Sequence, residues 1–338
     1  MKRVLAVRQD NNGDVMLIGP ALRAVATQAS VSLLCGPRGA AAAGLMPGVS
    51  DVIVWEAAWI DAEPRTVCAD DVGGFVADVR DRRFDEAIIF TSFHQSPLPT
   101  ALLLRMANVP RVGAISVDYP GSLLDVRHFV HDDMHEVERA LSLANAMHYT
   151  LPPKDDGRLA ICNVPAETKI GVSDYVVVHP GATVPARAWS PERNAELVRR
   201  LAFEGRDVIV TGSACERALT AFVAGQNVGA IDLGGETSFA EFAAIVRDAS
   251  VVVTGNTSAA HVAAATQTPV VSIFPPTIPA LRFRPWMVEH ILLGDQEAPC
   301  AGCRARACPI EGQPCLSNVT VDVVLNALQR YLRTKEVA

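Results

Sequence analysis

The stretch that decides the fold is residues 4–22, which read VLAVRQDNNGDVMLIGPAL. An apolar run at 4–7 is followed by a polar turn at 8–13, and a helical pattern begins at Asp14 and extends to residue 28. This order is typical of a strand and helix in an open parallel sheet. Ligands bind outside the carboxyl ends of such strands, so Asp14 is well placed for acid–base chemistry. The alternative role is helix capping, because Asp is a preferred N-cap residue.

Composition and charge limit the class of protein. The chain has 338 residues, 49% of them hydrophobic and 20% charged, which predicts a globular protein of two domains. No apolar run approaches the roughly 18 residues that span a bilayer, and no cleavage site follows the opening Met1-Lys2-Arg3. We therefore expect a cytoplasmic protein, with contact at the inner face of a membrane left open. The net charge of −7 disfavours nucleic acid as a partner.

Strand-like and helical runs alternate along both halves of the chain, which predicts βαβ units and parallel sheets. We expect two Rossmann-like domains, 1–165 and 166–320, joined near 151–173, with a ligand cleft between them. The segment 321–338, helical to residue 332, is expected to pack back toward the first domain. The strands are predicted at 4–7, 31–35, 52–55, 86–90, 111–115, 175–178, 208–211, 231–233, 251–254 and 270–274. The other helices are predicted at 14–28, 69–80, 97–107, 135–146, 191–201, 216–224, 239–249 and 259–266.

Three strand-end loops in the second half carry candidate ligand-binding side chains. The first offers Thr183 and Arg187, whose planar guanidinium suits phosphate. The second offers Glu216, and the third, residues 254–261, precedes a helix whose N-terminus can bind an anion. Each has a structural alternative: solvated surface for Arg187, a helix-end role for Glu216 and a satisfied histidine in the first helical turns for His261. The usual fingerprints of dinucleotide-binding and ATPase loops do not occur in the sequence.

The chain resembles glycosyltransferase family 9, the ADP-heptose heptosyltransferases of lipopolysaccharide core assembly. The resemblance rests on several ordered motifs rather than on any one of them. These motifs are Gly13-Asp14 with Pro20-Ala21-Leu22, Pro110-Arg111-Val112-Gly113, His135-Glu136-Val137-Glu138-Arg139, and 256–261 followed by Pro269-Val270-Val271. Together they cover nearly the whole chain.

The resemblance implies an α/β protein of the GT-B fold, in which the first domain binds the acceptor and the second a nucleotide sugar. It implies an inverting, metal-independent transfer of heptose or a related sugar from an ADP-sugar, without a cofactor, and with Asp14 as the general base. The donor diphosphate and nucleotide would contact Thr183, Arg187, Glu216, Thr237, Ser238, Thr257, Ser258 and His261, and the donor sugar Asn256. The acceptor would contact Asp10, Asn11, Gly13, His94 and Gln95.

Two departures from the family pattern leave the substrates open. Asn256 stands where the family commonly has Asp, and an amide both donates and accepts hydrogen bonds whereas a carboxylate only accepts them. Asp10 places a second carboxylate near the predicted base, as a decoy or as a like charge acting on Asp14. The acceptor is then lipopolysaccharide core or a small natural product. A non-catalytic nucleotide-sugar-binding protein is the alternative from a different class.

Four of the eight cysteines, Cys300, Cys303, Cys308 and Cys315, lie within sixteen residues and include one CxxC pair. The spacing loosely resembles a zinc or iron–sulfur ligand set. A structural zinc site, a reduced or partly disulfide-linked loop, and a loop without a defined role all stay open. A cytosolic setting favours metal over disulfide. The reaction implied by the resemblance needs no metal there.

Overall fold

The computed structural model describes residues 1–61, 63–131, 134–168 and 170–332. It divides into two compact units, Met1–Cys162 and Asn163–Ala338. Within the described residues, each unit contains a six-stranded sheet whose neighbouring strands all pair in parallel. No helix in these ranges combines the length and the apolar character needed to cross a membrane. The predicted pair of Rossmann-like sheets is therefore confirmed.

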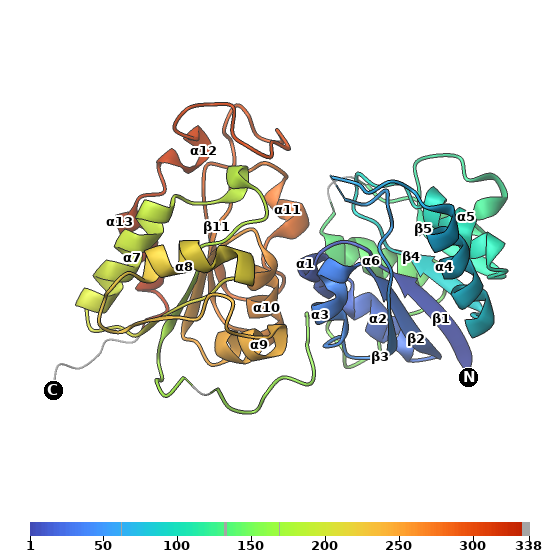
Figure 1. Ribbon diagram of the computed structural model, residues 1–338, viewed down its shortest axis with the longest axis horizontal. Coiled ribbons are helices and arrows are strands. Elements are labelled where there is room, and N and C mark those ends of the chain that lie inside the picture. The colour runs from blue at the N-terminus through green and yellow to red at the C-terminus, as the bar shows by residue number, and fades with distance from the viewer. Residues whose placement is uncertain (62, 132–133, 169, 333–338) are drawn as a thin grey trace. The chain divides into compact units, whose positions relative to one another are not determined.

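In the first unit the sheet is covered by helices on both faces (Figure 1). Its strands are β1 (Lys2–Val7), β2 (Ala29–Cys35), β3 (Val49–Val54), β4 (Glu86–Ile89), β5 (Arg111–Ile115) and β6 (Val126–His128). Its α-helices are α1 (Asn12–Leu17), α2 (Gly19–Ala26), α3 (Ala40–Ala43), α4 (Ala69–Arg82), α5 (Leu98–Met106) and α6 (Glu136–Ala146). Leu5 and Val7 of β1 join a core with α4 and α5, while Val4 and Ala6 are buried on the other face. Burial on both faces explains why β1 reads as an unbroken apolar run.

The second unit repeats this construction. Its strands are β7 (Val176–His179), β8 (Val208–Val210), β9 (Ala230–Asp232), β10 (Val251–Gly255), β11 (Val270–Ile273) and β12 (His290–Leu293). Its α-helices are α7 (Pro191–Phe203), α8 (Arg217–Ala224), α9 (Phe239–Arg247), α10 (Ser258–Thr266), α11 (Ala280–Phe283), α12 (Pro314–Ser317) and α13 (Val321–Leu328). One core joins α7, α8 and α13 to the sheet, and α9 and α10 pack together (Figure 1).

The two sheets share one strand order. The first runs β3-β2-β1-β4-β5-β6 and the second β12-β11-β10-β7-β8-β9, so in each unit the first and fourth strands of the unit are central neighbours. This is the doubly wound order in which successive connections leave the centre in opposite directions. The switch points lie between β1 and β4 in one unit and between β7 and β10 in the other. Side chains that follow these four strands are thereby gathered into one place in each unit.

Three structural details differ from the sequence-based expectation. The helix predicted at 14–28 is divided into α1 and α2, because Pro20 has no N–H to donate to the carbonyl four residues earlier. Strands β6 and β12 were not predicted; both are short edge strands and only partly buried. The helix α13 ends at Leu328, before the predicted end at residue 332, and its Val324, Leu325 and Leu328 belong to the core of the second unit. Residues 333–338 of the predicted C-terminal segment lie outside the described ranges.

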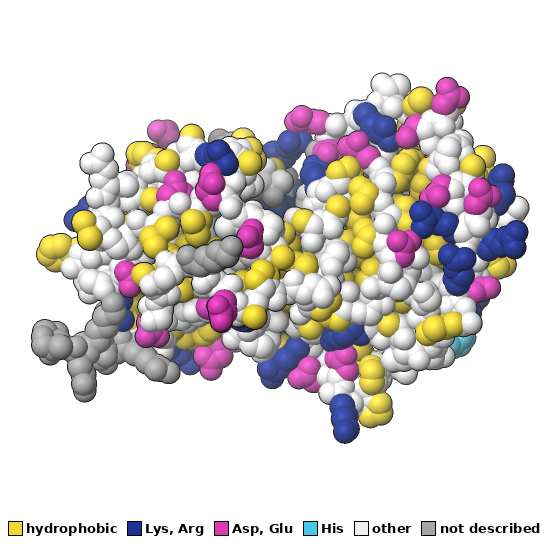
Figure 2. All heavy atoms as spheres, turned by 60° about the horizontal axis from the view of Figure 1, so that its bottom comes forward, with side chains coloured by type: hydrophobic (Ala, Val, Ile, Leu, Met, Phe, Trp, Pro, Cys, Tyr) yellow, Lys and Arg dark blue, Asp and Glu magenta, His cyan; other side chains and the backbone are white. Residues whose placement is uncertain are grey.

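Charged side chains of both signs are interspersed over the face drawn in Figure 2, with apolar side chains between them. Many of the surface charges form ion pairs within one unit. Arg82, for example, lies 2.9 Å from Asp78 and 2.7 Å from Asp51. Such exposed pairs contribute little to stability, with a median of about 0–1 kcal/mol each.

A buried carboxylate joins three strands and a loop at the amino end of the first sheet. Glu86 is 3% exposed and accepts hydrogen bonds from Lys2, Arg111 (2.7 Å) and the Tyr149 hydroxyl (2.7 Å). Burial alone would raise the pKa of Glu86, but these donors lower it below its ordinary value. The group therefore ties β1, β4, β5 and the segment after α6 together in its ionised form.

We predict that Glu86→Ala lowers the free energy of unfolding by about 1–3 kcal/mol, because it leaves the buried Tyr149 hydroxyl without its acceptor and removes the partner of the partly exposed Lys2 and Arg111. The wild type should also lose stability as the pH falls through the lowered pKa of Glu86, and the variant should lose less over that range. Urea unfolding followed by circular dichroism measures both effects. Glu196→Ala, which removes an exposed pair with Arg199 on α7, is the control expected to change little. Equal losses in the two variants would contradict the structural role of Glu86.

Candidate functional site

In the first unit, the switch point is occupied by a buried guanidinium. Arg8 directly follows β1, and its side chain is only 2% exposed. Its Nη2 donates to Asp14 Oδ1 (2.9 Å) and to Ser92 Oγ (2.8 Å), and its Nε lies 2.9 Å from Asp10 Oδ2. Glu136 at the start of α6 places Oε2 3.8 Å from Nη1. One cation therefore binds carboxylates from the loop after β1 and from two helices.

The Asp14 carboxylate lies at this site with one oxygen engaged and the other available. Asp14 is the third residue of α1, and its side chain is 19% exposed. Arg8 holds Oδ1, while Oδ2 has the Asn11 N–H at the long distance of 3.4 Å. Asn11, not Asp14, is the N-cap of the helix. The capping role of Asp14 is thus limited to this long contact, made from the third position of the helix. Its Oδ2 keeps the capacity to accept a further proton or hydrogen bond.

Asp10 has a different environment from Asp14. It is 7% exposed, Gln95 Nε2 donates to its Oδ1 at 2.5 Å, and Arg8 lies against its Oδ2. Burial raises the pKa of Asp10; the charge of Arg8 opposes this effect and that of Asp14 adds to it. The Oδ1 of Asp10 thus accepts from Gln95, and its Oδ2 is buried in the ion pair with Arg8. Of the two carboxylates that the sequence placed here, Asp14 is therefore the one open to a substrate.

The other predicted acceptor residues surround this pair. Gln95 contacts Asp10 and also accepts from the Ser92 N–H (3.1 Å). His94 is exposed, with its ring against Phe93, and Gly13 is buried inside α1. The sequence analysis missed Arg8, Ser92 and the contact of Glu136 as members of the site. A cation directly after an apolar strand, followed by two acidic residues, was the signal that could have identified Arg8.

In the second unit, the loops after β7 and β8 are in close contact. A Cβ on Gly181 would lie 1.9 Å from Glu216 Oε1, so only glycine allows the carboxylate to rest against this backbone. Glu216 ends the 3₁₀ turn η4 (Ala214–Glu216) and accepts from the Ser213 N–H (2.7 Å) and hydroxyl (2.6 Å). The helix-end role is therefore present, and it also holds the carboxylate beside Gly181. Burial lowers the pKa of the nearby His179, whose Nδ1 lies 3.0 Å from Thr211 Oγ1.

The loop after β10 leads into the N-terminus of α10. Thr257 is its N-cap and accepts from the Ala259 N–H (3.3 Å), Ser258 is its first residue, and His261 is buried in its first turn. No acidic residue lies in that first turn, so the positive end of the helix dipole is not neutralised from within the helix. Asn256 precedes the cap and is half-buried. This is the arrangement of an anion-binding helix terminus.

The backbone of Arg187 lies beside the end of β10, which leads into α10. Arg187 ends the 3₁₀ turn η3 (Pro185–Arg187), and a Cβ on Gly255 would lie 3.3 Å from its carbonyl oxygen. The loops after β7 and β10 therefore touch at Arg187 and Gly255. Of the remaining donor residues, Thr183 is exposed and Thr237 half-buried, and Ser238 is the N-cap of α9, where it accepts from the Glu241 N–H (3.2 Å).

The cysteine-containing loop braces these donor-side loops. The Ala186 N–H donates to the Arg306 carbonyl (2.9 Å), and Gln313 Nε2 donates to the Ala186 carbonyl (2.8 Å), directly before Arg187. Further along, the Gly302 N–H donates to the Pro276 carbonyl (2.7 Å). The loop thus supports the backbone on which Arg187 stands, whatever its cysteines bind.

The four cysteines of this loop are free thiols. Among the described residues, no group of three or more His, Cys, Asp and Glu side chains is arranged to hold a metal ion. Cys303 is exposed, Cys300 and Cys308 are half-buried, and Cys315 is buried among core residues. The structural zinc site that the spacing left open therefore has no preformed ligand set among the described residues, and the backbone hydrogen bonds of the loop give it a structural role of their own.

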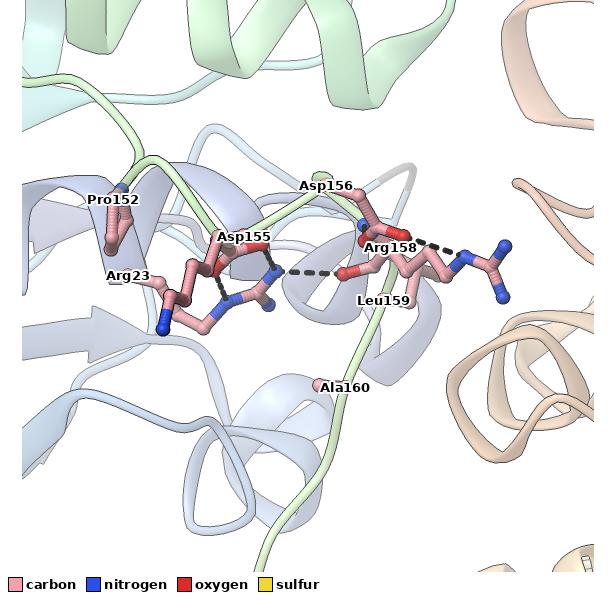
Figure 3. A pocket seen from close by; sticks show the side chains of 8 residues that line it. Arg23, Pro152, Asp155, Asp156, Arg158, Leu159 and Ala160 are labelled. Carbon is pink, nitrogen blue, oxygen red and sulfur yellow. Dashed lines mark hydrogen bonds and ion pairs between the residues drawn. The ribbon is translucent and has the colours of Figure 1, made fainter.

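A pocket of about 520 Å³ on the first unit lies away from the switch point (Figure 3). It is formed by the last turn of α2 and the segment after α6, at the amino end of the sheet. Arg23 donates to both oxygens of Asp155 (2.6 and 2.8 Å) and to the Arg158 carbonyl (2.8 Å). These bonds make the pocket a structural tie rather than a candidate active site, because ligands of such sheets bind at the carboxyl ends of the strands.

The fold and the two sites define a doubly wound, two-unit α/β protein with carboxylates at one switch point and an anion-binding helix terminus at the other. The model of glycosyltransferase family 9 (heptosyltransferase) matches residues 75–313, and the chain belongs to this family. The structure of E. coli ADP-heptose lps heptosyltransferase II is similar, with a TM-score of 0.74 and 21% identity over 98% of each chain. E. coli heptosyltransferase WaaC with ADP-2-deoxy-2-fluoro heptose is similar at 0.73, with 21% identity over 97% of this chain and 99% of that one. These likenesses confirm the GT-B fold.

In sequence, the lipopolysaccharide heptosyltransferase 2 of Salmonella typhimurium is 32% identical over 106 residues. The lipopolysaccharide heptosyltransferase 3 of E. coli is 30% identical over 128 residues. The first match covers 30% of each protein, and the second 36% of this chain and 37% of that protein. The chain thus spans about a third of the curated relatives that it matches.

We predict that the thiols react in the order of their burial. Cys303, exposed on its loop, should be alkylated early by iodoacetamide, and Cys35 last, because burial raises the pKa of Cys35 to about 11 and leaves little thiolate. Timed alkylation read by peptide mass spectrometry measures the order. If Cys300, Cys303, Cys308 and Cys315 were protected as a set and a chelator exposed all four, a metal centre would replace the free-thiol description.

Proposed function

We propose that this protein is an inverting glycosyltransferase that moves a heptose from ADP-heptose to an acceptor hydroxyl, with Asp14 as the general base. Membership of the family and the accessible Asp14 oxygen carry the proposal. In this account the first unit binds the acceptor and the second the nucleotide sugar. The donor is taken from the ligand named for the similar WaaC structure.

The chemistry assigned to Asp14 is a proton transfer coupled to a single displacement. The acceptor oxygen attacks the anomeric carbon of the donor sugar, and its proton passes to Asp14 Oδ2. The bond between the anomeric carbon and the diphosphate oxygen breaks, and ADP leaves with the electron pair. Attack from the face opposite the leaving group inverts the anomeric centre, through a transition state of oxocarbenium character.

The second unit supplies positive charge for the leaving diphosphate. In this proposal Arg187, whose backbone carbonyl lies beside Gly255, contributes a cation, and α10 contributes the N–H groups of its first turn. Glu216, held beside Gly181, would accept hydrogen bonds from the ribose hydroxyls. We propose that these groups act without a metal ion. Asn256, Thr183, Thr237 and Ser238 complete the proposed donor contacts.

The proposed acceptor is lipopolysaccharide core, as the names of the sequence relatives indicate. Because that acceptor is part of a membrane lipid, this proposal also requires contact with a membrane surface. Asn11, His94 and Gln95, around the Asp14 site, are the side chains proposed to meet it. A small-molecule acceptor would use the same base and the same donor.

We predict that Asp14→Ala lowers kcat by about 10²–10⁴-fold while leaving the affinity for ADP unchanged, because it removes only the base. Transfer from ADP-heptose, with a chelator present throughout, and titration of ADP by calorimetry measure the two quantities. Asp78→Asn on the exposed side of α4 is the matched control and should keep full activity. Near-wild-type transfer by Asp14→Ala would remove this residue from the mechanism, and loss of wild-type transfer with the chelator would refute metal independence.

Gly181→Ala tests the donor side. The added Cβ would displace the Glu216 carboxylate, so we expect the Kd for ADP to rise about 10-fold, the equivalent of one charged hydrogen bond. Gly73→Ala in α4, where a Cβ meets nothing within 4 Å, is the control and should bind ADP as the wild type does. An unchanged Kd in Gly181→Ala would argue against a nucleotide contact by Glu216.

A further inference from the structure

We infer that Arg8 is the positioning residue of the carboxylate site: it fixes the orientation of Asp14 and supplies the positive charge that holds Asp10, Asp14 and Glu136 together. This inference rests on the proposed role of Asp14 as the base. Arg8 itself touches no reacting atom in this account. It acts through the carboxylate that does.

The contacts of Arg8 reach four separate segments of the first unit. Its guanidinium meets Asp10 in the loop after β1, Asp14 in α1, Ser92 in the loop after β4, and Glu136 at the start of α6. Ser92 and Glu136, which lie 84 and 128 residues further along the chain, thus both contact the side chain of Arg8. A displacement of any of these segments would move the Asp14 carboxylate with it.

The geometry determines which Asp14 oxygen faces a substrate. A short bond from Nη2 holds Oδ1 at 2.9 Å, and Nη2 is itself held by Ser92 Oγ at 2.8 Å. With Oδ1 anchored, rotation of the carboxylate is restricted and Oδ2 keeps one direction. The planar guanidinium makes this possible, because it binds several acceptors at fixed angles, whereas a lysine ammonium is a compact charge.

The charges around Arg8 do not cancel in pairs. Three carboxylates face one guanidinium; Arg139 lies 4.0 Å from Glu136, and the charge of His94 acts on Asp10. Burial alone would lower the pKa of Arg8, but the charges of Asp10, Asp14 and Glu136 raise it, so Arg8 remains a cation. Without that cation, neighbouring carboxylates would repel each other and favour protonation.

The test compares Arg8→Met and Arg8→Lys with the wild type in transfer from ADP-heptose. For Arg8→Met we expect kcat at the pH optimum to fall about 100-fold, because the base is misplaced. The acid limb of its pH–rate profile should move to higher pH, because the positive charge that opposes protonation of the neighbouring carboxylates is gone. Arg8→Lys should restore the acid limb more than it restores kcat, because it keeps the charge and loses the fork. The KM for the donor should not change in either variant.

A second pair of variants separates positioning from folding. Arg8→Met/Asp10→Asn removes one buried negative charge together with the cation, so its stability in urea should recover toward that of the wild type. If kcat stays low in this double variant, Arg8 acts on orientation; if kcat recovers with stability, the role is structural and the inference is wrong. Arg23→Met, which breaks the Asp155 pair in Figure 3, is the matched control, expected to lose stability without a change in the acid limb.

A readout that needs no turnover keeps this inference separate from the proposed function. Water-soluble carbodiimide modifies protonated carboxyl groups, and peptide mass spectrometry reports, as a function of pH, the modification of Asp10, whose pKa the charge of Arg8 lowers. Its midpoint should move upward in Arg8→Met relative to the wild type and to Arg23→Met; an unchanged midpoint would overturn the inference. Failure of the wild type to use ADP-heptose, or full activity of Asp14→Ala, would overturn the proposed function, while the labelling still decides the role of Arg8.

Discussion

The constraint on which the rest of this structure depends is the covering of two parallel sheets on both faces. Parallel strands need crossover connections, and a sheet that is apolar on both sides needs helices on both sides. The chain meets this need by starting each sheet at its centre, with β1 or β7, and winding outward in both directions. The loops that follow the two central strands then lead away from each other. The polar residues at the starts of these loops therefore lie side by side at the carboxyl ends of the strands. Both candidate sites of this protein therefore lie where the winding changes direction.

The site in the first unit shows what is required to keep polar groups at such a place. Arg8 follows a strand whose last four residues are buried, so its guanidinium enters the interior and must find partners there. Asp10, Asp14, Glu136 and Ser92 provide them from both sides of the switch point. In the second unit the same demand is met mainly by the backbone. Gly181 and Gly255 allow close approach, and the cysteine-containing loop holds Ala186 from both its N–H and its carbonyl.

The sequence predicted what depends on local pattern and missed what depends on distant partners. Apolar runs located ten of the twelve described strands, and Ser190 with Pro191 marked the start of α7, where the Ser190 hydroxyl accepts from the Arg193 N–H. The place of Asp14 between the first strand and the first helix could be predicted because it depends on local sequence. The role of Arg8 could not, because it depends on Ser92 and Glu136, which are far along the chain. The cysteine spacing left a metal-ligand set open as one of three alternatives, and no spacing encodes the backbone hydrogen bonds that hold this loop.

The two switch points use the same helix position for opposite purposes. In the first unit the short helix α1 carries Asp14 in its first turn, so a carboxylate lies at the positive end of the helix dipole. In the second unit α10 has no acidic residue in its first turn, and its cap, Thr257, adds no charge. The N-terminus of α1 therefore already has a negative charge in its first turn, whereas the N-terminus of α10 has none and can receive an anion. The proposed reaction, which takes a proton from one substrate and releases a diphosphate from the other, would need this asymmetry, because a carboxylate at the start of α10 would repel the leaving group that Arg187 is proposed to bind.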